Sequence, residues 1–301
     1  MAKRICSSSK ERERWLEERR KGIGSSDAPA ILGISPFASP ATVAASKRGL
    51  DREDAESELM RWGHYVEGPM IEALRDETKM PAQLDGSMYR SEERGLEFMH
   101  ATPDGTVVAD GERGGIECKL KVFGADEWEE SGIPPHVVAQ CQHSMRVLEL
   151  RFFIVVALLD GYRLRWKRIE RDDAFINERL IPAERDFWSL IETGRAAPLH
   201  VGNPKATGRI LASMHPRDDG SIVQLDADAE GHAARWEEAQ EMERHWKTIK
   251  EQHRHALAGA IGNSTYGKLP DGTVLSLKTT DRSGYQVNPT TFRTLRREKK
   301  R

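Results

Sequence analysis

The stretch FMHATPDGTVVADGERGGIECKLKVF, residues 98–123, is the part of the chain that decides the fold class. Two β-rich runs, around 106–109 and 116–122, are separated by the Gly-rich segment 109–115, and this spacing predicts a hairpin or a close strand pair. The apolar run Phe152–Leu159 predicts a buried strand. Because helical patterns stand on both sides of these strands, the sequence predicts an α/β core with a central mixed sheet flanked by helices.

Further elements follow from the spacing of apolar residues and from Gly and Pro. Residues 162–170 predict one more strand, and helices are predicted over 10–21, 60–78, 136–150 and 173–193. The Gly/Ser turn that begins at Gly22 leads into a short helix, for which Ser25, Ser26 or Asp27 is a plausible N-cap.

The composition shifts after Gly194. Residues 194–208 are rich in Pro and Gly and predict a linker. A long charged helix is predicted over 226–258, with a thin apolar stripe typical of a coiled-coil-like arm (Trp236, Met242, Trp246, Ile249, Leu257). Turns at 271–272 and 282–284 predict a small β-hairpin unit. We therefore predict a core domain at 1–200 and a C-terminal appendage at 210–301 with a basic tail.

The net charge of −2 over 301 residues excludes a protein that binds nucleic acid by bulk positive charge. The charges are unevenly distributed along the chain. Residues 1–21 carry eight basic and four acidic side chains, and residues 291–301 carry six basic side chains and one acidic side chain. Residues 51–97 instead carry thirteen acidic and six basic side chains. Three cysteines cannot form a disulfide framework, and we find neither a secretory signal nor an apolar run that could span a bilayer. These features predict a cytoplasmic protein, in the host cytoplasm if it is phage-encoded, with no membrane association.

The candidate chemistry lies in Thr-Pro-Asp-Gly at 102–105 and in Glu117-Cys118-Lys119, which is separated from Asp104 by twelve residues. Asp104 and Glu117 can hold a hard divalent cation through carboxylate oxygens, with the Cys118 backbone carbonyl as a further ligand. Glu117 and Lys119 are two residues apart, so both point to one face of a strand, where Lys119 can act on a metal-bound water. The alternative to a metal site is that Asp104 and Gly105 form an ordinary turn and that Glu117 and Lys119 lie on a solvated face of the strand. The apolar setting favours a functional pair, because a buried charge pair without a task costs stability.

These residues resemble the PD-(D/E)xK nuclease motif, and the surrounding chain resembles the lambda-exonuclease / YqaJ-like viral recombinase family. The matching blocks stand in the family's order over about 12–192: ERRKGIGSSDAPAILG, RWGHYVEGPMIEAL, PDG, ECK and AQCQHSM. The resemblance implies a restriction-endonuclease-like α/β core.

Carried over residue by residue, the resemblance implies that Glu67 completes a Mg²⁺ site (with Mn²⁺ as substitute) made by Asp104 and Glu117, with Lys119 as the catalytic lysine. Of the two glutamines in the QxQ helix, Gln142 is favoured over Gln140 as the residue that supports the water or the lysine. Positions that hold a terminal DNA phosphate match Arg19 and Ser26, with Ser25 beside them, and Thr102 matches a small hydroxyl residue that touches phosphate. Asp110 and Glu112 remain alternative carboxylates. His64, His100, His136 and His143 raise the alternative of a zinc site, which is disfavoured because no His/Cys spacing fits one.

The function expected from this resemblance is metal-dependent hydrolysis of DNA, as a 5′→3′ exonuclease on duplex ends that supplies single strands for phage-type recombination. The implied partners are double-stranded DNA ends, a single-strand annealing protein and further copies of the chain, since ring-shaped trimers are known in this branch. An endonuclease with the same chemistry and a non-catalytic DNA-end-binding protein are the alternatives. Trp15, Phe37 and Trp62 are candidates for stacking at a DNA end, although core packing is the expected role for each.

Overall fold

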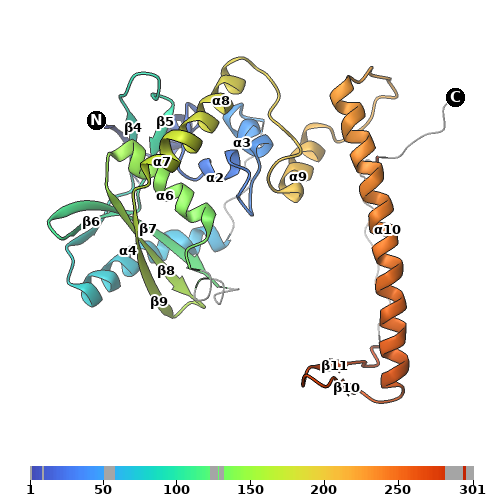
Figure 1. Cartoon of the computed structure of the whole chain (residues 1–301). Coiled ribbons are helices and arrows are strands. Elements are labelled where there is room, and N and C mark those ends of the chain that lie inside the picture. Colours follow the sequence, from blue (N-terminus) through green and yellow to red (C-terminus); the bar gives the residue numbers. More distant parts are fainter. Residues whose placement is uncertain are drawn as a thin grey trace. The chain divides into compact units, whose positions relative to one another are not determined.

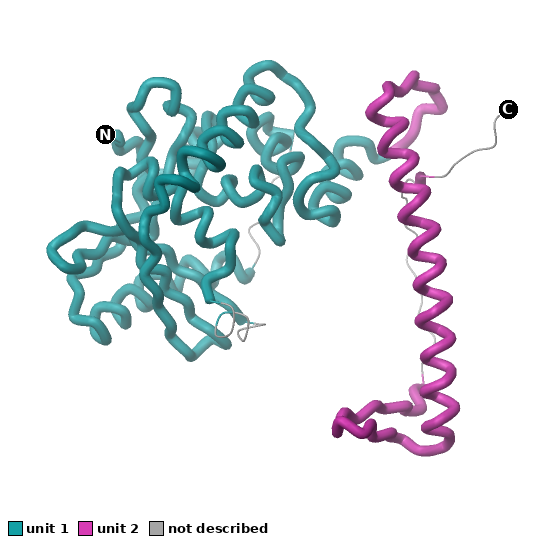
Figure 2. The backbone as a smooth tube through the Cα atoms, in the orientation of Figure 1, with its two compact units in different colours: residues 1–216 teal, residues 217–301 magenta. Residues whose placement is uncertain are grey.

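The computed structural model describes residues 2–8, 10–50, 58–122, 128, 132–281 and 294–295. The chain forms two compact units, Met1–Pro216 and Arg217–Arg301 (Figure 2). Each unit is described by itself below.

A five-stranded mixed sheet forms the centre of the first unit, as the sequence predicts (Figure 1). Its strands, in spatial order, are β3 (Ala82–Leu84), β6 (Gly105–Ala109), β7 (Glu112–Lys121), β8 (Phe152–Leu159) and β9 (Arg163–Glu170). Neighbouring strands are antiparallel except β7 and β8, which are parallel. A parallel pair needs a long crossover, and here helix α6 (Pro135–Leu148) lies within it.

Helices α4 (Glu58–Thr78) and α6 cover opposite faces of this sheet. Strand β8 shows why both faces are apolar, since alternate side chains pack to opposite sides. Phe152, Ile154 and Val156 pack with α4, whereas Phe153, Val155 and Ala157 pack with α6. The continuous apolar run in the sequence is therefore a strand that is buried on both faces.

The hairpin predicted from residues 98–123 joins β6 to β7 through Asp110-Gly111. Both loop residues have positive φ, 54° and 79°, as a tight two-residue hairpin turn requires. Asp110 and Glu112 therefore lie at the turn, whereas Asp104 precedes the far end of the hairpin, where Gly105 pairs with Ile116.

A second, four-stranded sheet lies beside the first in the same unit and was not predicted. Its order is β1 (Ala2–Ser7), β4 (Ser87–Ser91), β5 (Met99–Ala101) and β2 (Ile23–Gly24). The two glycines of the Gly22-Ile23-Gly24 segment permit this close approach of β2 to β5. A Cβ at Gly22 would lie 2.3 Å from the Phe98 carbonyl oxygen, and one at Gly24 would lie 2.8 Å from the His100 ring.

The other helices that the structure describes in the first unit are α1 (Arg12–Arg20), α2 (Ala28–Ile31), α3 (Pro40–Lys47), α7 (Asp173–Phe175), the π-helical turn η1 (Ile176–Leu180), α8 (Ile181–Glu192) and α9 (Pro204–Met214). Helix α9 contradicts the prediction of a plain linker over 194–208. Its N-cap Asn203 accepts a hydrogen bond from the Ala206 amide, and Thr207 donates one to Ser39 at the start of α3 (2.8 Å). The first unit thus extends beyond residue 200.

The described part of the second unit contains the long helix α10 (Ala227–Ile261) and a hairpin of β10 (Tyr266–Lys268) and β11 (Val274–Ser276). The turn predicted at 282–284, and most of the basic segment 291–301, lie outside the described residues. No helix in the described part of the chain is long and apolar enough to cross a membrane.

Candidate active site

Strand β7 places Glu117 and Lys119 on the face of the sheet that α6 covers. Their partners on β8 are Val155 and Ala157, which pack beneath that helix. Asp104 reaches the same strand from the start of β6, because its backbone amide donates to the Ile116 carbonyl (3.1 Å) and its Oδ2 accepts from the Cys118 amide (2.7 Å). The three residues singled out from the sequence therefore meet at one end of the hairpin.

Hydrogen bonds join this group to one glutamine of α6. Lys119 Nζ donates to Glu117 Oε1 (2.6 Å) and to Gln140 Oε1 (3.0 Å). Gln140 Nε2 in turn donates to Glu117 Oε1 (2.6 Å). Asp104, Glu117, Lys119 and Gln140 are called the carboxylate–lysine cluster below.

The preference for Gln142 over Gln140 is wrong. Gln142 is buried, and its Nε2 donates to the Glu170 carbonyl (2.8 Å) while its Oε1 accepts from the Asp172 amide (2.9 Å). Side chains two positions apart on an α-helix point in directions about 200° apart, so only one of the two glutamines can face β7. Gln142 instead ties α6 to the end of β9.

Burial and mutual repulsion disfavour the ionised form of Asp104 in the cluster. Burial, and then the charges of Glu117 and Glu67, raise the pKa of Asp104 well above its usual range. For Lys119, burial lowers the pKa, but the adjoining Glu117 outweighs it and the pKa lies above the ordinary value. A concentration of negative charge that one ammonium does not neutralise is a setting in which a bound cation stabilises the ionised form.

Glu67 lies on α4, near enough to Cys118 for its backbone carbonyl to be 4.0 Å from the Cys118 thiol. Its side chain is turned to His64, with 2.8 Å between Nδ1 and Oε1. Across the described ranges, no three His, Cys, Asp or Glu side chains are grouped closely enough to hold a metal ion. The donors nevertheless fit a hard divalent cation in chemistry, since all are carboxylate oxygens and the like charges of Asp104, Glu117 and Glu67 repel one another.

The residues assigned to phosphate binding form a second cluster on α1 and the following turn. Arg19 Nη2 donates to Ser26 Oγ (3.0 Å), and the Arg19 guanidinium lies 5.2 Å from the centre of the Trp15 ring. Trp15 Nε1 donates to Thr102 Oγ1 (3.2 Å). Arg19, Ser26 and Thr102 are thus connected through Trp15. Ser25 lies beside them but is buried, whereas Ser26 is exposed.

A buried ion pair beneath this second cluster was missed by the sequence reasoning. Lys47 Nζ donates to Asp27 Oδ2 (2.5 Å) and to the Arg19 carbonyl (2.9 Å). Asp27 is also the N-cap residue of α2, but its side chain accepts from the Gly24 amide rather than from the helix. The one available signal was a lysine at the end of the otherwise uncharged run PATVAASK.

The pKa values of this region follow from the same contacts. Burial raises the pKa of Asp27, but the Lys47 and Arg19 charges outweigh it and hold that pKa well below its usual range. Burial, together with the Lys47 charge, lowers the pKa of His100 to about 3. The His100 Nε2 lies 3.3 Å from the Arg19 carbonyl oxygen, so Lys47 and His100 both approach the end of α1.

The aromatic side chains depart in part from the core packing expected for them. Trp15 is half-buried, but Phe37 and Trp62 are 70% and 54% exposed. Phe37 makes an edge contact with His136, and Trp62 makes one with Tyr65. Core packing is therefore the wrong role for Phe37 and Trp62.

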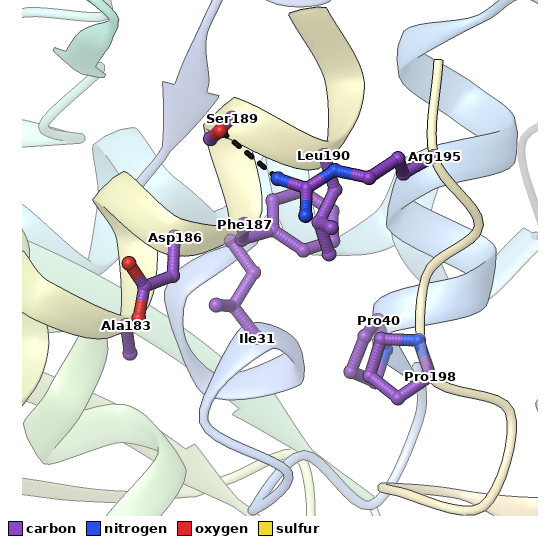
Figure 3. Close-up of a pocket in the computed structure, with 9 residues that line it drawn as sticks. All are labelled: Ile31, Pro40, Ala183, Asp186, Phe187, Ser189, Leu190, Arg195 and Pro198. Carbon is purple, nitrogen blue, oxygen red and sulfur yellow. Dashed lines mark hydrogen bonds between the residues drawn. The ribbon is translucent and has the colours of Figure 1, made fainter. Parts of the chain in front are cut away.

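A surface pocket of about 340 Å³ lies apart from these clusters, between α2, α3, α8 and residues 195–198 (Figure 3). Six of its nine lining residues are apolar, and Arg195 donates to Ser189 Oγ (3.2 Å). The pocket contains no residue of the carboxylate–lysine cluster, so its size does not mark it as the place of the chemistry.

Comparison with solved structures agrees with the fold. LHK-Exo, an alkaline exonuclease from Laribacter hongkongensis, is 23% identical and aligns over 60% of this chain and 93% of its own, with a TM-score of 0.49. The structure of LHK-Exo in complex with dAMP aligns over the same shares, also at 23% identity, with a TM-score of 0.50. At this identity the similarity is one of fold.

The sequence itself is similar to the uncharacterized protein YqaJ of Bacillus subtilis (strain 168). The two are 29% identical over 269 residues, which cover 85% of this chain and 83% of that protein. The model of the YqaJ-like viral recombinase domain matches residues 14–151, a range that spans both clusters. Residues 14–151 of this chain are therefore similar to the YqaJ-like viral recombinase domain.

Proposed function

We propose that this chain is a metal-dependent exonuclease that digests duplex DNA from its ends, in the 5′→3′ direction, and leaves single strands for homologous recombination. The observation that carries the proposal is the carboxylate–lysine cluster, in which Lys119 is held by both Glu117 and Gln140. The recombinase family of the domain and the exonuclease named for the structural neighbour support it.

Asp104, Glu117 and Glu67 would hold the cation, which is Mg²⁺ in this proposal with Mn²⁺ as a substitute. Such an ion would polarise the scissile phosphate and lower the pKa of a bound water. Lys119 presents an ammonium to the same place, where it can hold the attacking oxygen or the negatively charged phosphate by a hydrogen bond. Gln140 orients Lys119 and Glu117 by its two hydrogen bonds.

The grip on a DNA end is assigned to Arg19, Ser26 and Thr102. A guanidinium beside a hydroxyl group suits the oxygens of a terminal phosphate, and Thr102 is only two residues from Asp104 along the chain. This arrangement supports selection of a 5′-phosphorylated end close to the carboxylates. A single-strand annealing protein remains the proposed recipient of the exposed strand.

The test compares a 5′-phosphorylated linear duplex with a covalently closed circle, each with and without Mg²⁺. We expect Mg²⁺-dependent loss of the linear DNA only, and no loss with Lys119→Ala. Cutting of the circle would identify an endonuclease, and no loss of either DNA would leave a non-catalytic end-binding protein.

A matched pair of variants separates the site from the rest of the hairpin. Asp104→Asn removes a proposed ligand and should abolish cleavage. Asp110→Asn makes the same chemical change at the hairpin turn, where the side chain is 89% exposed, and should leave cleavage unchanged. Equal activity of the two variants would contradict the assignment.

A further inference from the structure

Helix α10 is long but buries none of its residues. It has 35 residues, none of them buried, and it carries large apolar side chains that are exposed, with Met242 52%, Trp246 64% and Leu257 43% accessible. A single helix in water gains little stability from its own hydrogen bonds, and most helices are stabilised by packing one face against a partner. Its C-terminal end contacts the hairpin of its own unit, where Gly267 of β10 approaches Ile261.

The less polar side chains of α10 follow one stripe. They recur at steps of three or four residues, the spacing of a coiled-coil seam: His232, Trp236, Ala239, Met242, Trp246, Ile249, His253 and Leu257. The sequence predicts a thin stripe on a coiled-coil-like arm, and the structure shows that the helix is unbroken over the whole stripe.

The stripe is nearly symmetric about Arg244. Met242 and Trp246 lie two residues on either side of that centre, and Ala239 and Ile249 lie five on either side. Two copies of the helix that cross in opposite directions at this centre would place Met242 against Trp246, and the small Ala239 against the large Ile249. Large side chains opposite small ones are what a tightly packed seam requires.

The charges of α10 and its N-cap are divided at the same centre. Residues 226–243 contain seven Asp or Glu, one Arg and one His, whereas residues 244–261 contain four Lys or Arg, three His and one Glu. A favourable interaction with the helix dipole explains only the charges of the terminal turns. Antiparallel pairing sets the acidic half of one helix beside the basic half of the other, and parallel pairing sets like charges together.

We propose that α10 pairs with α10 of a second copy of this chain, as an antiparallel two-stranded coiled coil centred on Arg244. The inference concerns assembly and does not depend on the nuclease proposal. The acidic N-terminal half makes DNA an unsuitable occupant of the stripe, because phosphate would be repelled along it.

The first test measures the mass of the full chain in solution by light scattering after gel filtration. Met242→Glu with Trp246→Glu introduces four charges at the centre of the paired seam, and we expect the particle mass to fall by a factor of two. Gln240→Glu with Thr248→Glu adds the same charge on the opposite side of the helix and should leave the mass unchanged. Circular dichroism checks that both variants stay helical. An unchanged mass in the seam variant would overturn the proposal.

The second test determines the orientation by disulfide formation between single-cysteine substitutions. Chains with Ala239→Cys and chains with Ile249→Cys should cross-link when mixed, whereas neither should cross-link alone, since equivalent positions of an antiparallel pair lie far apart. The unsubstituted chain under the same oxidation controls for Cys6, Cys118 and Cys141. Efficient cross-linking of Ala239→Cys with itself would show a parallel pair and contradict the antiparallel arrangement.

Discussion

At the residue scale, Gln140 and Gln142 show how one helix serves the site and the fold at once. The apolar residues Val137, Cys141 and Met145 direct one face of α6 onto the sheet. The two glutamines flank that face, each about 100° from Cys141. Gln140 thereby reaches Glu117 on β7, and Gln142 reaches the end of β9.

Substitution of the two glutamines should separate catalysis from stability. Gln140→Ala removes the support of Lys119 and should lower the turnover number by one to two orders of magnitude, with little change in the unfolding free energy. Gln142→Ala leaves the Asp172 amide and the Glu170 carbonyl unpaired and should cost about 1–3 kcal/mol of stability with near-normal turnover. Urea unfolding and steady-state cleavage of linear DNA measure both effects. Reduced turnover of Gln142→Ala together with near-normal turnover of Gln140→Ala would instead support a catalytic role for Gln142.

His100 should make the stability of the protein depend on pH. Its pKa is about 3 in the folded protein, against 6.5 for an ordinary histidine, so between these values the unfolded chain binds a proton that the folded chain does not. The contribution of neutral His100 to the unfolding free energy is fully present above pH 6.5 and is lost as the pH falls from 6.5 towards 3. Between pH 7 and pH 5 it should decrease by about 2 kcal/mol.

The measurement is the unfolding free energy at these two pH values for the unmodified chain and for His100→Gln. The variant should lose less stability on acidification. Asp27 does not confound the comparison, because its pKa is depressed and it is ionised in both states at pH 5 and above. The same pH slope in both proteins would show that His100 is not the group responsible.

The residue scale also marks the limit of prediction from sequence. Asp104, Glu117 and Lys119 could be found because their spacing on a hairpin is local. The choice between Gln140 and Gln142 could not, since both flank the apolar face of α6 and only the order β7–β8–β9 decides which glutamine meets Glu117. The Lys47–Asp27 pair joins residues that are twenty positions apart, and no periodicity predicts such a contact.

At the element scale, the β6–β7 hairpin holds Asp104 against Glu117, and its geometry depends on Gly105. A Cβ at this position would lie 2.7 Å from the Gln83 carbonyl oxygen and 2.8 Å from Ile71 Cδ1. Glycine thus allows β3, β6 and α4 to pack together next to the site.

Gly105→Ala should therefore move the hairpin and Asp104 with it. We expect a loss of about 1–3 kcal/mol in unfolding free energy, as for overpacking of a core, together with at least a tenfold loss of cleavage. Gly63→Ala, on α4 with open space around it, is the control and should be neutral or slightly stabilising. Thermal unfolding and DNA cleavage of both variants give the comparison, and equal behaviour would show that close packing at Gly105 is unimportant.

Long elements with a clear period were predictable, and short ones were not. Strand β8, strand β9 and helices α4, α6 and α10 stand where their patterns place them. The four-stranded sheet escaped prediction because β2 has only two residues and β1, AKRICS, is too polar to read as a strand. Helix α9 was taken for linker because Pro and Gly surround it, yet Pro204 stands in its first turn, where proline is tolerated.

At the scale of the whole molecule, the near-zero net charge is an average over regions with opposite roles. Glu67 belongs to the acidic block, and its charge helps to raise the pKa of Asp104, a repulsion that the proposed cation would offset. Arg19 belongs to the basic N-terminal segment and contacts Ser26. The overall composition excluded binding by bulk charge, but it could not exclude a nuclease whose charges are segregated.

The central claim is that the carboxylate–lysine cluster hydrolyses DNA, and one comparison on strand β7 tests it most directly. Glu117 is buried within the cluster, whereas Glu112 is exposed at the start of the same strand. The measurement is the Mg²⁺-dependent release of nucleotides from a 5′-phosphorylated linear duplex by Glu117→Gln and by Glu112→Gln. We predict a loss of about a thousandfold for Glu117→Gln and unchanged release for Glu112→Gln. Unchanged release by a folded Glu117→Gln protein would contradict the account.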